Sequence, residues 1–436
     1  MALTDTERRL CDLIKARADL LLQQLAEHVA ISTGRNNTPG LNRYRDLVAG
    51  RLSALGAVIK HMPGEPRPKW LDTPGRSSAG TSIPPTLVAK HRVDAATPRI
   101  LIVGHLDTVH DPEDSFCELT VSSDGKIATG PGAVDMKGGV LIAVTALEML
   151  AEAGVELNWT MLLNSDEETG SFHSEAVLRE AASGHDLGIV LEPALADGAL
   201  VIERVGSGQF MVEVFGRSAH AGRDFTKGVS AVNKLAEIII VLAQMARPPS
   251  GAVVNVGPLQ GGPVTNTVPD YAAAWGNVRY ADADAGTRLA AAIDALATAD
   301  DALPRVVVHR CWNRPPKPTT EAVRGFAEAA RAVAEDLGPA HRGLPFASAG
   351  GVCDGNNLQD AGLATIDSLG VRGGNLHRND EYVEVASLVE RCQLLAALLA
   401  RLAQGGVHIP SERDPVTAVA VPGVDNHGGP PHREGV

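Results

Sequence analysis

The sequence predicts an α/β protein with a mostly parallel central sheet, interrupted by an inserted ferredoxin-like α+β domain. Two patterns lead to this prediction. In the first half of the chain, short β-like runs alternate with helical stretches, which is typical of a parallel sheet covered by helices. From about residue 205 the order becomes β-α-β-β-α-β, which is the split βαβ arrangement. A length of 436 residues exceeds one ordinary domain and accommodates both parts.

The elements of the outer domain follow from apolar runs and their spacing. Three short runs predict strands at 99–103 (RILIV), 159–163 (WTMLL) and 187–191 (LGIVL). Segment 136–153 predicts a helix because its apolar residues recur at helical spacing, and Gly154 is a typical helix stop. Segment 1–22 predicts an amphipathic helix in which charged residues lie among the leucines, so we expect no export signal.

The inserted domain is predicted from a second set of elements. They are strands at 210–214, 252–256, 271–280 and 306–309, with helices at 229–246 and 287–297. After the proline-rich segment 314–318, helix and strand resume through residue 402. We therefore divide the chain into an outer domain formed by 1–204 and 315–403, an inserted domain at 205–314 and an irregular tail at 404–436. Segment 62–85 is also expected to be irregular, and His427 and His432 of the tail are expected to be solvated.

Composition excludes two classes of partner. Acidic residues outnumber basic ones, 52 to 39, which gives a net charge of −13 and no basic surface for nucleic acid. The sequence has no apolar run of about 18 residues, so we expect no membrane span. The five cysteines are odd in number and form no CxxC pair, which favours a reducing cytoplasm over a disulfide framework.

Several side chains of metal-binding or acid–base type follow predicted strands, including a strand-like run at 364–369, or stand at the head of a predicted helix. They are His105, Asp107, Asp135, Asp166, Glu167, Glu168, Glu192 and His377. Because sites in α/β sheets form outside the carboxyl ends of the strands, we expect these side chains to meet at one edge. Taken singly, each also has an ordinary structural explanation: Asp135 could cap a helix, and 166–168 could be a solvated helix start.

The set of donor atoms indicates a pair of divalent cations. Two imidazoles and three carboxylates suit zinc, with manganese or cobalt as alternatives, and exclude a thiolate structural site. Five ligands can hold two ions if one carboxylate bridges them, and such a pair activates a water and polarises a scissile carbonyl. Glu167 can then carry the proton from the water to the leaving nitrogen. Asp107 can accept the far ring N–H of His105 and fix its tautomer.

Four motifs, in this order, resemble those of a known family. They are 105–109 (HLDTV), 132–139 (GAVDMKGG), 166–171 (DEETGS) and the glycine-rich loop that leads to His377. They are similar to those of the co-catalytic dinuclear metallopeptidases and amidohydrolases that include aminoacylase, acetylornithine deacetylase and succinyl-diaminopimelate desuccinylase. Within that group they most resemble the glutamate carboxypeptidases of the carboxypeptidase G type. The resemblance extends over about residues 98–402.

The resemblance implies a role for each ligand. His105, Asp135 and Glu192 would bind one ion, and Asp135, Glu168 and His377 the other, with Asp135 as the bridge and Glu167 as the general acid/base. The dipeptidase branch usually has aspartate at the position of Glu192, so glutamate favours the carboxypeptidase and desuccinylase branch. The family commonly has a cis bond after the bridging aspartate, so the Asp135–Met136 peptide is expected to be cis.

The resemblance also assigns the inserted domain a lid and dimerisation role. His220 in 216–222 (GRSAHAG) matches the family's lid histidine, which reaches the neighbouring subunit's active site and stabilises the oxyanion. A homodimer is therefore implied. Asn266 and Arg279 match contacts to the substrate carboxylate, which an arginine can bind through two hydrogen bonds. Arg372, five residues before His377, adds a positive charge near the metal edge and is a further candidate for substrate binding.

Two departures from the family pattern leave the substrate open. Cys353 stands where relatives usually have serine, and His173 replaces a small residue; since no base pairs with Cys353 in the sequence, a nucleophilic role is disfavoured. We predict a hydrolase that cleaves an amide C–N bond of a small carboxylate-bearing substrate, as a glutamate carboxypeptidase or an N-acyl-amino-acid amidohydrolase. One alternative is an aminohydrolase that releases ammonia from a non-peptide, including an aromatic, C–N bond. The other is a non-catalytic binding protein, which the intact ligands and Glu167 disfavour.

Overall fold

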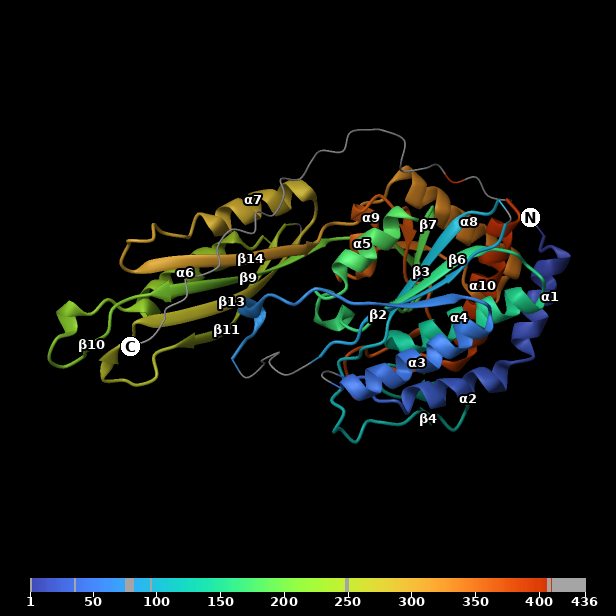
Figure 1. The fold of residues 1–436 in the computed structure, drawn as a ribbon, viewed down its shortest axis with the longest axis horizontal. Coiled ribbons are helices and arrows are strands. Elements are labelled where there is room, and N and C mark those ends of the chain that lie inside the picture. Colours follow the sequence, from blue (N-terminus) through green and yellow to red (C-terminus); the bar gives the residue numbers. More distant parts are fainter. Residues whose placement is uncertain are drawn as a thin grey trace.

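The chain forms an α/β part and a separate antiparallel sheet that extends from one side of it (Figure 1). The computed structural model describes residues 2–34, 37–74, 82–94, 96–247, 251–405 and 409. Most of the tail predicted from residue 404, including His427 and His432, lies outside this part of the chain. Within it, no helix combines the length and the apolar character that crossing a membrane requires.

The central sheet of the α/β part has six strands in the order β1-β2-β6-β3-β7-β16. The strands are β1 (Val58–Met62), β2 (Thr86–His91), β6 (Asn158–Asn164), β3 (Arg99–His105), β7 (Leu187–Val190) and β16 (Thr365–Ile366). The last four are mutually parallel. At one edge β2 pairs antiparallel with β6, and β1 pairs antiparallel with β2. The three strands that the apolar runs predict are confirmed, and all three lie in the parallel portion.

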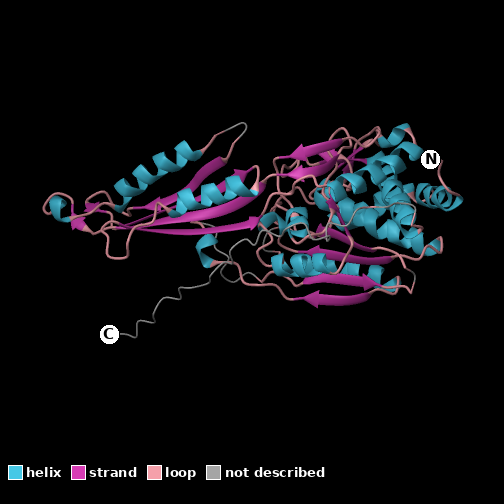
Figure 2. Ribbon diagram, turned by 90° about the horizontal axis from the view of Figure 1, so that it is seen from above, coloured by secondary structure: helices cyan, strands magenta, loops and turns pink. Residues whose placement is uncertain are grey.

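Helices cover both faces of this sheet (Figure 2). Ile100 and Ile102 of β3 face the larger core, whereas Leu101 and Val103 face a smaller one, as the alternation of side chains in a strand requires. The larger core is completed by α1 (Asp5–Lys15), α2 (Ala18–Val29), α3 (Thr38–Ala54), α4 (Gly138–Glu152), α8 (Glu321–Leu337) and α10 (Val385–Ala403). The smaller core is completed by α5 (Glu175–Ser183) and α9 (Asp354–Asp360).

In the α/β part, the helix predicted at 136–153 is confirmed and the one predicted at 1–22 differs. Helix α4 ends as expected just before Gly154, which has a φ of +72°. The single N-terminal helix expected over 1–22 is instead two, because the chain turns at Ala16 and Arg17. The Arg17 guanidinium pairs there with Glu152 at the end of α4, at 2.8 Å.

Two small sheets, which the sequence analysis did not predict, bring distant loops together. One contains β4 (Thr120–Val121), β5 (Ile127–Thr129), β18 (Tyr382–Glu384) and β17 (Gly373–Gly374). The other pairs β8 (Leu200–Arg204) with β15 (Phe346–Ala349). Because β18 pairs with β5, the loop that carries His377 lies next to the loop that carries Asp135.

The inserted sheet has the order β11-β13-β9-β14 and is antiparallel throughout. Its elements are β9 (Gly206–Phe215), α6 (Ala231–Met245), β11 (Val253–Gly261), β13 (Tyr271–Tyr280), α7 (Ala283–Asp294) and β14 (Arg305–Arg314). This is the predicted β-α-β-β-α-β order, and both helices pack on one face of the sheet (Figure 1). A short pair, β10 (Ala219–His220) with β12 (Thr267–Val268), was not predicted and lies at the end far from the α/β part.

Segment 62–74 is more ordered than its composition suggests. It contains a short helical turn, Lys69–Leu71, and reaches the helix-free face of the inserted sheet. There the Trp70 carbonyl accepts a hydrogen bond from the Trp275 indole at 2.7 Å. The Trp70 ring stacks on the ring of His309. The rest of the segment expected to be irregular includes residues 75–81, which lie outside the described chain.

Candidate active site

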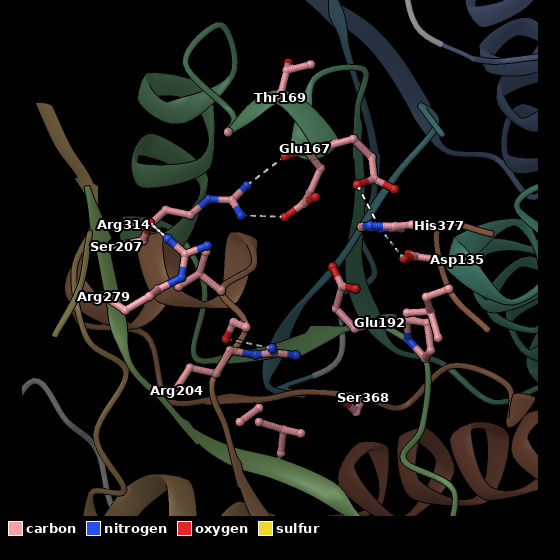
Figure 3. A pocket seen from close by; sticks show the side chains of 18 of the residues that line it. Asp135, Glu167, Thr169, Glu192, Arg204, Ser207, Arg279, Arg314, Ser368 and His377 are labelled. Carbon is pink, nitrogen blue, oxygen red and sulfur yellow. Dashed lines mark hydrogen bonds and ion pairs between the residues drawn. The ribbon is translucent and has the colours of Figure 1, made fainter. Parts of the chain in front are cut away.

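The predicted metal ligands converge at the carboxyl edge of the parallel strands. Figure 3 shows Asp135, Glu192 and His377 among them, on the wall of one cavity. His105 is the last residue of β3, Glu168 follows β6 in a short turn, and Glu192 follows β7. Asp135 comes from the loop that leads into α4. The peptide bond between Asp135 and Met136 is cis, as the resemblance implies. His377 comes from the turn between β17 and β18.

These five side chains form two triads that share Asp135. In His105, Asp135 and Glu192, and again in Asp135, Glu168 and His377, the potential donor atoms lie within 4.8 Å of one another. Asp135 Oδ1 is 3.2 Å from His105 Nε2, and its Oδ2 is 3.5 Å from His377 Nε2. The two oxygens of one carboxylate therefore face different triads, which is the arrangement a bridging ligand requires.

The electrostatics of the cluster fit two divalent cations. Burial raises the pKa of Glu192 well above its usual range, and the neighbouring carboxylates of Asp135 and Glu167 add to this effect. Burial also raises the pKa of Glu168, whose Oε1 is buried without a hydrogen-bond partner in the described chain. Hydrogen bonds to Asp135 and Glu168 raise the pKa of His377 to about 10. Crowded, buried carboxylates of this kind need compensating positive charge, and the nitrogen and oxygen donors suit zinc, manganese or cobalt.

The orientation of His105 differs in one detail from the sequence prediction. Its Nδ1 lies 2.9 Å from the backbone carbonyl oxygen of Asp107 but 3.6 Å from the Asp107 carboxylate, so the carbonyl is the acceptor. The predicted tautomer is unchanged, because Nδ1 carries the hydrogen and Nε2 faces Asp135. The Asp107 carboxylate instead accepts backbone N–H groups from Glu167 at 3.2 Å and from Glu168 at 3.0 Å.

Glu167 points into the same cavity and is paired with an arginine from the proline-rich segment 314–318 of the sequence analysis. Its Oε1 lies 2.7 Å from Nη1 of Arg314, the last residue of β14 (Figure 3). Arg314 Nη2 also donates to the Glu167 carbonyl at 3.1 Å. Burial opposes the charged form of Arg314, but Glu167 and Asp354 outweigh it and raise the pKa of Arg314 above its usual value. Nothing in the local sequence signals this contact, because the two residues are 147 positions apart.

A cavity of about 660 Å³ opens beside the triads, and its wall combines acids with arginines. Arg67, Arg204, Arg279 and Arg314 all line it. Arg204 pairs with the buried Asp367 at 2.6 Å. Arg279, which was predicted to contact a substrate carboxylate, bonds to Ser207 Oγ and Asn277 Oδ1, and within the described chain no carboxylate pairs with it. The sequence analysis missed Arg67 and Arg204 as well as Arg314.

Three other predicted residues are not brought to this cavity. His220 and Asn266 lie together at the β10–β12 end of the inserted domain, where the Asn266 carbonyl accepts the backbone N–H of Ala221 at 2.9 Å. Within one chain, neither residue lines the cavity. Arg372, which was predicted to bind substrate, does not line the cavity: its side chain is buried and pairs with Glu384, at 3.0 Å, and with Glu390.

The two departures from the family pattern have structural roles. Cys353 is 1% exposed, caps α9 and donates from Sγ to Asp367 at 2.9 Å. Burial raises the pKa of the Cys353 thiol well above its usual range, which disfavours a thiolate nucleophile. His173 links the turn after β6 to segment 62–74, because its ring Nδ1 lies 3.0 Å from the Glu65 carbonyl.

Comparison with known proteins identifies the family of the chain. A protein-family model described as peptidase family M20/M25/M40 matches residues 101–401. The chain belongs to this family. It is 26% identical to carboxypeptidase G2 of Pseudomonas sp. over 88% of this chain and 90% of the relative, and 26% identical to the succinyl-diaminopimelate desuccinylase of Gluconacetobacter diazotrophicus over 84% and 97%. An M20 metallo-carboxypeptidase from Sulfolobus solfataricus has the same fold, with a TM-score of 0.65 at 16% identity over 88% of this chain and 99% of the other. The M20 protein is therefore a hydrolase of carbon–nitrogen bonds from a metal-dependent family.

Proposed function

We propose that this M20 hydrolase is a dinuclear enzyme that cleaves an amide C–N bond in a small carboxylate-bearing substrate, as a glutamate carboxypeptidase or an N-acyl-amino-acid amidohydrolase. The observation that carries the proposal is the pair of triads that share Asp135, with Glu167 on the same cavity wall. Similarity to carboxypeptidase G2 and to the desuccinylase supports this choice of bond and substrate class.

Each triad would hold one cation, with zinc as the proposed ion and manganese or cobalt as alternatives. When bound, the two cations lower the pKa of a water and polarise the substrate carbonyl. His105 is prepared for this role because its Nδ1–H is held by the Asp107 carbonyl, which leaves Nε2 free to donate its lone pair. Asp107 also holds the turn that carries Glu167 and Glu168 through its carboxylate.

Glu167 supplies the acid–base step. Because its Oε1 is paired with Arg314, Oε2 is the oxygen that accepts a proton from the attacking water. The water oxygen bonds to the carbonyl carbon, and Oε2 then gives the proton to the nitrogen as the C–N bond breaks. The products are a carboxylic acid and an amine.

We assign the substrate carboxylate to Arg279. Burial lowers the pKa of this guanidinium, and the nearby charge of Arg314 lowers it further, so an anion in the cavity would relieve an electrostatic cost. A carboxylate that replaced the Ser207 and Asn277 contacts could bind through two hydrogen bonds.

A homodimer would complete the site. The edge strand β11 and helix α6 of the inserted domain expose large apolar side chains, among which Ile240 is 60% and Leu259 56% accessible. Covering these residues with a second copy would remove apolar surface from water and could bring His220 and Asn266 of the partner to the cavity. Light scattering after size exclusion should give twice the mass of one chain, 45.5 kDa; a monomer at all concentrations would contradict the assignment of His220.

Metal analysis combined with a hydrolysis screen tests the proposed reaction. Purified protein should contain two divalent ions per chain and should release amino acid from N-acyl-amino acids or from compounds with a C-terminal glutamate. Ammonia release without amino-acid release would support the aminohydrolase alternative. Absence of both, in protein that carries metal, would leave the non-catalytic alternative.

A further inference from the structure

The end of β14 holds the turn that carries Glu167. We call residues 166–171, which follow β6, the base loop. Asn313 Nδ2 donates to the Gly170 carbonyl at 2.5 Å, and Arg314 Nη2 donates to Ser171 Oγ at 2.7 Å. Together with the Arg314 bonds to the side chain and the carbonyl of Glu167, two consecutive residues of the inserted domain bind the base loop at four acceptors.

These contacts are buried and charged. The Arg314 and Glu167 side chains are only 5% and 9% exposed, so their pairing is largely shielded from solvent. Arg314 also lies 3.6 Å from Asp354, the first residue of α9, and Asp354 in turn accepts from Ser171 at 2.5 Å. Removing one partner from a buried pair leaves the other charge uncompensated, so this guanidinium controls the geometry of the loop strongly.

We propose that Arg314 is a positioning residue for Glu167, through which the inserted domain sets the orientation of the base. This inference rests on the proposed function, because it assumes that Glu167 moves the proton. With Oε1 bound by Nη1 and the loop backbone bound by Nη2, the Glu167 carboxylate is fixed with Oε2 available. A lysine at position 314 would keep the charge but could not make both contacts from one planar group.

The bonding of Arg314 distinguishes it from a substrate anchor. Both of its terminal nitrogens are bonded to the base loop, with Asp354 also near Nη2, and only Nε lacks a partner within the described residues. Arg279 lines the same cavity, but no carboxylate of the described chain pairs with it. The arrangement therefore assigns binding of the substrate carboxylate to Arg279 and positioning of the general base Glu167 to Arg314.

Kinetics of Arg314→Lys and Arg314→Met test the proposal. We expect kcat to fall about 100-fold in both, because misplacing a general base forfeits much of a 10²–10⁴-fold contribution, while KM and metal content change little. When either substitution is combined with Glu167→Gln, kcat should fall little further, because the effects of residues that act through one group are not additive. Arg310→Gln is the matched control, since Arg310 lies on the same strand and pairs on the surface with Asp294. A rise in KM at constant kcat, or a fully active Arg314→Lys, would overturn the proposal.

Hydrogen exchange of metal-free protein gives a second readout that does not depend on activity. In Arg314→Met and Arg314→Lys, peptides that cover residues 166–171 should exchange faster, whereas Arg310→Gln should match the wild type. Unchanged exchange in both Arg314 variants would show that Arg314 does not hold the loop. If the wild type hydrolyses no substrate, the proposed function fails, and this measurement alone decides whether Arg314 positions the loop. If Arg314→Met does not fold, the test is made with Arg314→Lys, which retains the charge.

Discussion

Glu381→Gln should loosen the loop that presents Asp135 to both triads. The Glu381 side chain is buried, and its Oε1 accepts backbone N–H groups from Val134 at 2.9 Å and Asp135 at 3.0 Å. Its Oε2 accepts from Gly132 at 3.3 Å and lies 2.7 Å from His110 Nε2. Glu381 is four residues after His377, so one short segment of chain supplies a ligand and also fixes the shared aspartate.

The expected magnitude follows from the number of bonds. A glutamine amide must turn its NH₂ group toward one pair of donors, so about two hydrogen bonds to a charged acceptor are lost. Each is worth about 1.5–3 kcal/mol, and after relaxation we expect a loss of about 3 kcal/mol in the free energy of unfolding. Since Asp135 faces both triads, zinc affinity should also fall about 10- to 100-fold, the usual effect of removing a residue that orients a ligand.

Urea unfolding of metal-free protein and zinc titration against a competing chelator measure the two effects. Glu328→Gln is the matched control, because Glu328 pairs with Arg331 at 3.4 Å on the surface of α8 and such pairs contribute little. If Glu381→Gln and Glu328→Gln have equal stability and equal zinc affinity, then Glu381 does not hold the Asp135 loop and the reasoning is refuted.

Three further predictions concern the base, the substrate anchor and a buried histidine. Glu167→Gln should retain its metal, as measured by elemental analysis, while kcat falls at least about 100-fold; retained turnover would exclude Glu167 as the base. Arg279→Lys should raise KM about tenfold or more with little change in kcat, and only for substrates that carry the carboxylate; an equal effect on substrates without it would contradict the assignment. Burial lowers the pKa of His185 to about 4, below the unfolded value of about 6.5, so its stabilising contribution is present above pH 6.5 and is lost as the pH falls toward 4. Between pH 6 and 5, the free energy of unfolding of His185→Gln, measured in urea, should therefore fall by about 1 kcal/mol less than that of the wild type. Parallel pH profiles of the two proteins would contradict this prediction.

Much of the fold could be predicted because its long elements have strong periodic signals. Strands such as β3, and helix α4 with Gly154 after it, are set by local apolar pattern, and the inserted domain shows its order of elements directly. The two-residue strands of the small sheets have no such signal, since a pair such as Gly373 and Gly374 shows no alternation. Their pairing depends on tertiary contacts, and it is this pairing that brings the His377 and Asp135 loops together.

The candidate site divides in the same way. The ligands could be predicted because each stands at the end of a recognisable element, and the sheet then gathers them at one edge. The residues that hold the ligands and Glu167 in place could not be predicted, because their contacts form only after the chain has folded. Asp107 illustrates the limit: its position beside His105 was informative, but whether its carboxylate or its carbonyl faces the ring depends on the Glu167 and Glu168 amides.

Two arginines show why proximity in sequence is a poor guide to the charges around this site. Arg372 lies five residues before His377, yet its charge is compensated by Glu384 and Glu390, which do not line the cavity. Arg314 lies far from every motif of the outer domain, yet the register of β14 against β9 delivers it to Glu167. A positive charge is available to the site only if it is not already compensated by carboxylates outside the site. That condition depends on which partners are buried with it, and only the folded chain determines them.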